Sequence, residues 1–160
     1  MRDLRPTSSK VRQALFNILY DVSDIFFLDL FAGTGEIGIT ALKKGAKPVY
    51  FVEIEKKRAS DIKRKVSKIS KDFKVFPIDA LKFLKNTKET FDVIFADPPY
   101  NYKNYDRLIK EAKKHLNEGG VFILEHRSNM NFYADKEKKI RRYYFIFLVF
   151  NLKRKILNVK

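Results

Sequence analysis

The chain contains no cysteine, and this absence excludes several kinds of chemistry. Without a thiol there is no disulfide, no cysteine nucleophile and no zinc site built on cysteine ligands. Histidine is almost as scarce, because His115 and His126 are the only two. Neither lies in a pattern of metal ligands, so we expect no metal site and assign both histidines a structural role.

Long hydrophobic runs are also missing. The longest apolar stretch, residues 143–150, is much shorter than the roughly 20 residues that a membrane-spanning helix needs. Residues 1–6 include arginine and aspartate and do not resemble a secretory signal. We therefore expect a cytoplasmic protein without a membrane partner. The length predicts a single domain over residues 1–160, which we expect to be a monomer.

Acidic residues are few relative to basic ones. Asp and Glu number 19 and Lys and Arg 34, so the formal net charge is +15 at pH 7. Such a charge says little about the fold, but it favours anionic partners. One interpretation is that the lysines serve solubility or reflect biased codon usage. The other is a polyanionic substrate, which the motifs described below favour.

Short apolar runs alternate with amphipathic segments along most of the chain. This pattern is typical of an α/β fold with a mostly parallel sheet and helices on both faces. Two β-like runs near the end have no helix between them, and they predict an antiparallel pair that completes a seven-stranded sheet. We expect strands at residues 25–31, 49–52, 73–76, 91–96, 121–125, 138–142 and 144–151. We expect helices at about residues 7–20 and at 37–44, 56–70, 80–84 and 105–116, the last closed by Gly119-Gly120.

A glycine-rich loop follows the first predicted strand. Gly33, Gly35 and Gly38 fit the G-x-G-x-x-G pattern of nucleotide cofactor sites, and Glu53 follows about 20 residues later. An NAD-dependent oxidoreductase is therefore one interpretation, and a tight turn without a ligand is another. Asp29, just before the loop, would oppose a pyrophosphate, but its carboxylate could hold the ammonium of S-adenosylmethionine. We therefore favour S-adenosylmethionine as the cofactor.

Acids at the ends of the next two predicted strands extend this site. Glu53 would accept hydrogen bonds from ribose hydroxyls, and Asp79 with the Ala80 backbone would lie by the adenine amino group. Simpler interpretations stay open, because Asp79 could only cap a helix and Glu53 could be a solvated loop acid. The predicted cofactor-binding residues are Asp29, Phe31, Gly33, Thr34, Gly35, Glu53, Ile54, Asp79 and Ala80, with S-adenosylhomocysteine as the product.

The tetrapeptide Asp97-Pro98-Pro99-Tyr100 follows the fourth predicted strand. Proline fixes φ at two successive positions, so this turn is rigid. The Asp97 carboxylate and the Pro98 carbonyl can accept both N–H groups of an exocyclic base amine, which frees the nitrogen lone pair. Tyr100 can stack on the base. Strand termination is the simpler interpretation, but ligands of doubly wound sheets bind at the carboxyl ends of strands.

We therefore predict Asp97, Pro98 and Tyr100 as catalytic residues in methyl transfer to a nucleobase amine, with no metal. Methylation of pyrimidine C5 is disfavoured, because it normally uses a covalent thiolate and the chain has none.

Three motifs together resemble the bacterial family of 16S rRNA guanine-N2 methyltransferases. They are Leu-Arg-Pro-Thr at residues 4–7 with the helix motif at 11–19, the glycine loop at 29–35 and the turn at 97–100. The first is the specific one, because adenine-N6 methyltransferases share the other two. The resemblance implies a Rossmann-like class I methyltransferase fold, S-adenosylmethionine as the donor and a guanine of 16S rRNA as the target.

The resemblance also implies contacts with the substrate. Arg5 and Thr7 would border the active site, and we add Asn17, Pro99 and Tyr102 as substrate-binding residues. A packing role stays open for Asn17 and a helix-capping role for Tyr102. Family members usually carry a basic β-hairpin before the first motif, and we expect that element to touch RNA.

The choice of substrate is the least defined expectation. The turn serves guanine N2 and adenine N6 alike, and RNA and DNA both present phosphates. No separate recognition domain is visible in 160 residues, which favours a substrate that already displays an unpaired base. We expect 16S rRNA in the assembling small ribosomal subunit. The alternatives are an adenine-N6 methyltransferase and a basic RNA-binding module with a vestigial cofactor site.

Overall fold

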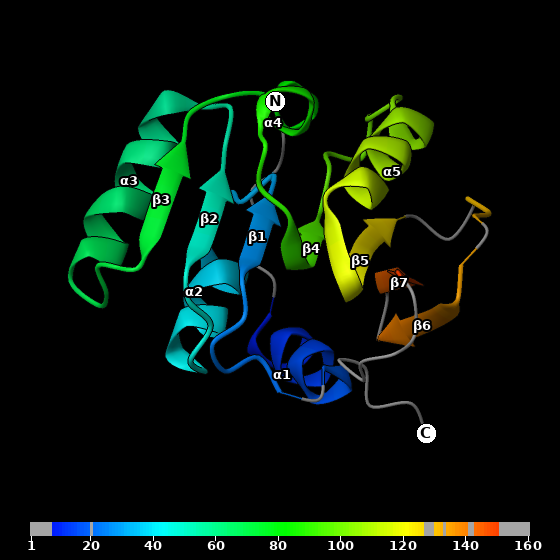
Figure 1. Cartoon of the computed structure of the whole chain (residues 1–160), viewed down its shortest axis with the longest axis horizontal. Helices are drawn as coiled ribbons and strands as arrows, with labels where there is room; N and C mark the ends of the chain where they lie inside the picture. The colour runs from blue at the N-terminus through cyan, green and yellow to red at the C-terminus, as the bar shows by residue number, and fades with distance from the viewer. Residues whose placement is uncertain (1–7, 20, 127–129, 133, 141–142, 151–160) are drawn as a thin grey trace.

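The computed structural model describes residues 8–19, 21–126, 130–132, 134–140 and 143–150. Its centre is a seven-stranded sheet in the order β3-β2-β1-β4-β5-β7-β6 (Figure 1). Strands β1 to β5 are parallel to one another, whereas β7 runs antiparallel to both β5 and β6. The strands are β1 Phe27–Leu30, β2 Val49–Val52, β3 Phe73–Phe76, β4 Phe91–Ala96, β5 Leu116–His126, β6 Lys136–Ile140 and β7 Tyr143–Val149. The predicted mostly parallel sheet with an antiparallel C-terminal pair is confirmed.

Helices cover both faces of this sheet. The apolar sides of α1, α2 and α3 pack on one face, and those of α4 and α5 pack on the other. Side chains alternate between the two cores, so Phe27 faces the first and Leu28 the second. In the described part of the chain, no helix is both long and apolar enough to cross a bilayer. The helices are α1 Ser9–Ile18, α2 Glu36–Lys43, α3 Lys56–Ser67, α4 Ala80–Asn86 and α5 Tyr105–Lys114.

The order of the strands reverses between β1 and β4. Strands β2 and β3 continue the sheet on one side of β1, and β4 and β5 continue it on the other. The two inner strands share a register in which Leu30 pairs with Ala96. The loops after β1 and β4 therefore leave the same edge side by side, and crevices at such a point bind ligands in open α/β sheets.

The prediction that Gly119-Gly120 closes the helix expected at residues 105–116 is wrong. Helix α5 ends at Lys114, and β5 starts at Leu116, which pairs with Phe91. Both glycines lie inside β5, at a shift of register against β4. Gly119 has φ +77°, and a Cβ on Gly120 would come within 2.8 Å of the Asn117 carbonyl oxygen. The two glycines therefore permit the irregularity of β5 at this shift of register.

Element boundaries differ from the prediction by a few residues. Strand β1 stops before Phe31, which has φ +55°, and α3 stops at Ser67, after which Ile69 N–H donates to the Val66 carbonyl. The first helix is capped by Ser8, whose hydroxyl accepts from Val11 N–H at 3.3 Å. The predicted ends of the last two strands at residues 141–142 and 151 fall outside the described residues.

Gly38 lets α2 approach β2 closely. A Cβ at this position would lie 2.3 Å from Cε1 of Phe51, which is fully buried. We expect Gly38→Ala to lower the free energy of unfolding by about 1–3 kcal/mol, because the ring or the helix has to move. Urea denaturation measures this loss, and Ser60→Ala on the exposed side of α3 is the control. An unchanged midpoint for Gly38→Ala would contradict the close approach.

Candidate functional site

A cavity of about 310 Å³ opens at the carboxyl ends of β1 and β2. Its size suits a nucleoside-sized ligand. It brings together five of the predicted cofactor-binding residues, Phe31, Glu53, Ile54, Asp79 and Ala80, and two of the predicted substrate-binding residues, Pro99 and Tyr102. Val52, Glu55, Arg58 and Ile78 complete the lining.

Glu53 links the cavity to the glycine loop. Its side chain is 3% exposed. Oε1 accepts from Gly33 N–H at 2.9 Å, and Oε2 accepts from Glu55 N–H at 2.8 Å. A carboxylate oxygen has further lone pairs, so Glu53 can still accept hydrogen bonds on its cavity side. The interpretation of Glu53 as a solvated loop acid is wrong, because the side chain is buried.

The backbone amides of Gly33, Gly35 and Gly38 already have partners. Gly33 donates to Glu53, Gly35 donates to the Ala32 carbonyl at 2.8 Å, and Gly38 donates to Oδ2 of buried Asp29 at 3.0 Å. Two of these three acceptors are carboxylates. A phosphate needs free N–H donors at such a loop and is opposed by nearby negative charge. These three amides are therefore unsuited to bind a pyrophosphate.

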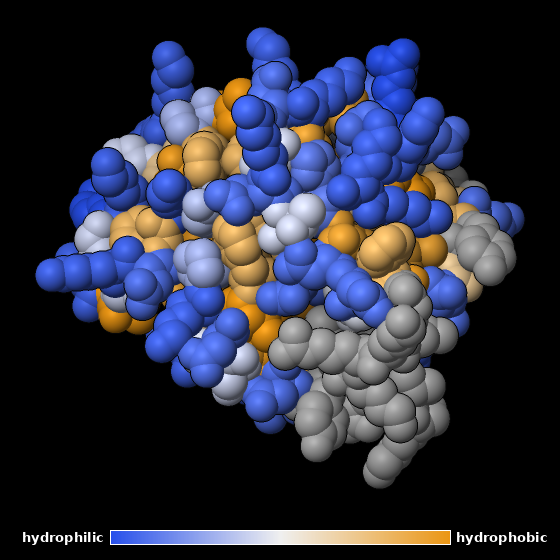
Figure 2. Space-filling view, viewed as in Figure 1, coloured by the Kyte–Doolittle hydropathy of each residue, from blue (hydrophilic) through white to orange (hydrophobic). Residues whose placement is uncertain are grey.

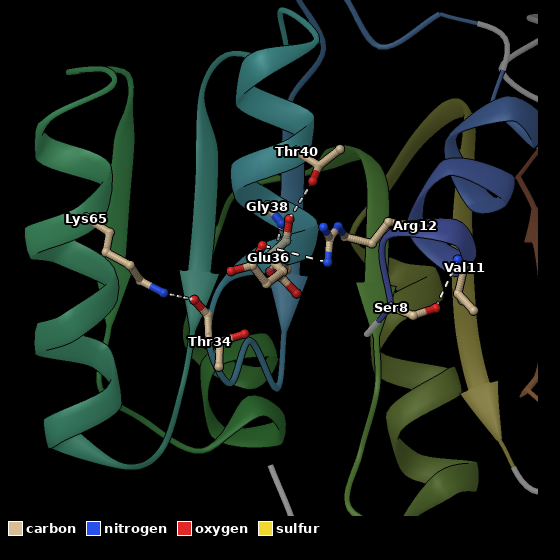
Figure 3. Close-up of polar contacts among 9 residues, drawn as sticks. Ser8, Val11, Arg12, Thr34, Glu36, Gly38, Thr40 and Lys65 are labelled. Atoms are coloured by element: carbon tan, nitrogen blue, oxygen red, sulfur yellow. Dashed lines mark hydrogen bonds and ion pairs between the residues drawn. The ribbon is translucent and has the colours of Figure 1, made fainter. Parts of the chain in front are cut away.

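Two basic side chains hold the same loop from outside. Figure 3 shows Lys65 reaching from α3 to the Thr34 carbonyl and Arg12 reaching from α1 to Glu36. The Nζ–O distance to Thr34 is 2.5 Å, and the Arg12–Glu36 ion pair spans 3.7 Å. Neither residue was predicted from the sequence, because no local spacing relates a helix residue to a loop that is distant along the chain. Together they fix the loop between two helices.

Aromatic rings form one wall of the cavity. Phe31 meets Tyr102 edge to face at 5.2 Å between ring centroids, and Tyr102 meets Tyr105 in the same way at 5.3 Å. The Tyr102 backbone N–H donates to the Pro99 carbonyl and so fixes the wall to the turn. Burial, with the charge of Asp79 and the neighbouring Tyr105, raises the pKa of Tyr102 to about 12. Its phenol therefore stays protonated at physiological pH.

Asp79 has the capping role that the sequence left open. Its Oδ2 accepts from Lys82 N–H at 3.0 Å and begins α4. The residue still lines the cavity. Capping and a ligand contact are compatible, because a carboxylate has two oxygens.

The turn after β4 lies next to this cavity. Pro99 is part of the lining, Pro98 is buried and Asp97 is partly exposed. The Tyr100 side chain is 69% exposed. On the other side of the cavity, Ile54 is 66% exposed. Large hydrophobic side chains with that exposure at the rim of a cavity are available to a ligand.

Other predicted residues lie apart from the cavity or outside the description. Gly33, Thr34, Gly35 and Asp29 do not line it, although the first and last anchor its loop. Asn17 is exposed on α1, next to Phe16, whose ring lies under Lys44 at the far end of α2. Arg5 and Thr7 lie outside the described residues. Among the described residues, no cluster of three or more potential ligands could hold a metal ion.

Arg58 and Glu55 are lining residues that the sequence analysis missed. Arg58 Nε lies 3.0 Å from Glu55 Oε2. The spacing of three residues on a helix predicts such a pair. It gives no sign that the pair faces a cavity.

Comparisons with known proteins agree with this architecture. The family model described as "Conserved hypothetical protein 95" matches residues 1–143. The chain is 36% identical over 112 residues to the protein named Ribosomal RNA small subunit methyltransferase D in Haemophilus influenzae. That alignment covers 66% of this chain and 58% of the relative, so the match spans less than two thirds of the relative's length.

Solved structures extend the likeness to the fold. The Escherichia coli protein yhhF superposes with a TM-score of 0.83 at 23% identity, covering 94% of this chain and 89% of that one. SMU.776, solved with S-adenosylhomocysteine, gives a TM-score of 0.74 at 14% identity, covering 89% and 50%. At these identities the likeness shows the fold alone, which is Rossmann-like. The chain therefore belongs to the Conserved hypothetical protein 95 family, and the resemblance to small-subunit rRNA methyltransferases predicted from its three motifs is confirmed.

Proposed function

We propose that the protein transfers a methyl group from S-adenosylmethionine to the exocyclic N2 amine of a guanine in 16S rRNA. The observation that carries this proposal is the set of partners of the glycine loop. Amides that would bind a pyrophosphate instead donate to Glu53 and Asp29. This disfavours a dinucleotide and suits a cationic cofactor without phosphate.

The donor set around the cavity fits the adenosyl part of that cofactor. Glu53 supplies acceptors for ribose hydroxyls, and Asp79 and Ala80 supply polar atoms for the adenine edge. Phe31, Ile54 and Ile78 supply apolar surface. Arg58, a cation in the lining, pairs with Glu55. The structural neighbour SMU.776 was solved with S-adenosylhomocysteine, which supports the same ligand class.

The bound cofactor would supply an electrophilic methyl group. The Asp97 carboxylate and the Pro98 carbonyl would accept the two N–H groups of the guanine amine. These contacts favour a pyramidal nitrogen, and they stabilise the positive charge that develops as the nitrogen attacks. Tyr100 would stack on the base. Leu30 at the end of β1 pairs with Ala96 at the end of β4. The turn that would hold the amine therefore lies beside the loop after β1, where the donor would be bound.

The substrate rests on relatives and on the three motifs. The Haemophilus influenzae relative is named as a small-subunit rRNA methyltransferase. The net charge of +15 suits a polyanion. We propose that the enzyme acts in the cytoplasm on the assembling small subunit, as a monomer and without a metal.

Two measurements test the function. Calorimetry should show binding of S-adenosylhomocysteine and none of NADH, and the reverse result would overturn the methyltransferase proposal.

Primer extension and mass mapping of rRNA from a deletion strain should show one missing N2-methylguanosine. An intact rRNA map with lost N6-methyladenine in DNA would favour the adenine enzyme, and strong RNA binding without transfer of labelled methyl would favour the vestigial module.

A further inference from the structure

We propose that the outer faces of α4 and α5 bind the RNA backbone beside the target base. This inference rests on the proposed function and assigns it a docking surface. We call this surface the α4–α5 face and define it by six cations that are all exposed: Lys82, Lys85, Lys88, Lys103, Arg107 and Lys110.

Three cations lie on α5 or just before it. Arg107 and Lys110 are three residues apart on α5, a spacing that places side chains on one side of a helix, and Lys103 precedes the first residue of this helix by two positions. In the part of the chain that the structure describes, none of the three forms an ion pair. With a rise of about 1.5 Å per residue, Arg107 and Lys110 lie about 5 Å apart along the helix axis. These three side chains therefore present positive charge that no ion pair among the described residues neutralises.

Helix α4 adds a second group of cations beside those of α5. It packs on the same face of the sheet as α5, and the two helices contact each other. Lys82 and Lys85 lie one turn apart on α4, and Lys88 follows it. Asp106 and Glu89 are exposed acids nearby, so the six cations outnumber them. Figure 1 shows both helices near the edge where the parallel strands end, and Figure 2 shows hydrophilic side chains over that region, as over much of the visible face.

The place of α5 in the chain relates this charge to the reaction site. The turn ends at Tyr100, and α5 begins at Tyr105, whose ring contacts Tyr102 in the cavity wall. Phosphates that flank a base held at Asp97 would therefore pass over the start of α5. Most contacts between proteins and nucleic acids go to the backbone and fix the register of the bound strand.

Helix α3 is also basic, but its position is different. Asp61 on α3 pairs with Arg64, and the N-cap residue Glu55 pairs with Arg58. Lys57, Lys63 and Lys68 remain exposed. In the sheet, β1 and β2 separate β4 and its turn from β3, against which α3 packs. These three lysines therefore provide a control with the same change of charge at a different place.

The test compares two triple variants with the wild type. The first is K103Q/R107Q/K110Q, and the control is K57Q/K63Q/K68Q. Filter binding of 16S rRNA transcribed in vitro, with S-adenosylhomocysteine present, is measured over a range of salt. We expect the first variant to bind about tenfold more weakly and to reduce the slope of log affinity against log salt by about 2, because each lost phosphate contact removes about 0.7 for a single strand.

The same variant should raise KM for RNA with little change in kcat or in affinity for S-adenosylhomocysteine. Equal weakening in both triple variants would show that only total charge matters, and unchanged binding in the first would show a merely solvated surface. Either result overturns the docking surface. If the wild type and the variants follow the expected binding pattern but no guanine is methylated, the surface stands and the proposed reaction fails.

Discussion

Asp97→Asn is expected to slow methyl transfer by about 10²–10³-fold, the typical effect of removing one group that stabilises transition-state charge. The side-chain amide of asparagine cannot offer two anionic oxygens to the guanine amine, whose nitrogen becomes positive during the transfer. The Pro98 carbonyl remains, so some activity should persist. Single-turnover transfer of labelled methyl to unmethylated 16S rRNA measures the rate.

Affinity for S-adenosylhomocysteine should stay close to that of the wild type, because Asp97 is not among the lining residues of the cavity. Asp61→Asn is a suitable control, since it makes the same chemical change in a carboxylate that pairs with Arg64 on α3. If Asp97→Asn keeps the full rate, the amine-acceptor role is wrong. If its cofactor affinity falls as much as its rate, Asp97 acts on the cofactor instead.

The Glu53→Ala variant is expected to bind S-adenosylhomocysteine about 100-fold more weakly. The substitution removes the carboxylate that would accept from the ribose hydroxyls and that accepts from two backbone amides. The cost has a second part. Gly33 and Glu55 N–H groups would be left without their present partner, so the free energy of unfolding should also fall by about 2–3 kcal/mol. Calorimetry and urea denaturation measure the two effects separately, at a temperature where circular dichroism shows a folded variant.

Glu89→Ala provides the control, because it makes the same chemical change at an exposed acid that does not line the cavity. Its affinity for S-adenosylhomocysteine should stay within about threefold of the wild type, as is usual for surface substitutions. Wild-type affinity in a folded Glu53→Ala protein would refute the ribose contact. Loss of stability with unchanged affinity would leave Glu53 a purely structural residue.

Much of this architecture was predictable, because its signals are local. Buried parallel strands are short continuous apolar runs, and residues 91–96 match β4 without error. The cofactor loop combines glycines with an acid about 20 residues later, and the structure joins Gly33 to Glu53 by a hydrogen bond. Ser8 and Asp79 both begin helices, as residues of their type do.

What escaped prediction depends on contacts between distant segments. Lys65 reaches Thr34 across 31 positions, and nothing near Lys65 distinguishes it from the other lysines of α3. Gly119-Gly120 looks like a helix terminator in sequence. It lies instead in a strand, because Leu116 already pairs with Phe91. Asn17 belongs to the helix motif that resembles the family, but it lies away from the cavity. Along α1, Arg12 pairs with Glu36 at the start of α2, and Phe16 contacts Lys44 at the end of α2, so Asn17 lies toward the opposite edge of the sheet.

The pairing of Leu30 with Ala96 also bears on timing and selectivity. The ladder between β1 and β4 spans all four residues of β1, so the strand ends that precede the glycine loop and the turn are held in one register. The central sheet would have to break before these strand ends could part. In the proposed reaction, a wrong base would therefore not be rejected through a movement of these two strands. Discrimination would then fall to the RNA, through how readily its own folding lets one guanine swing out and stay out.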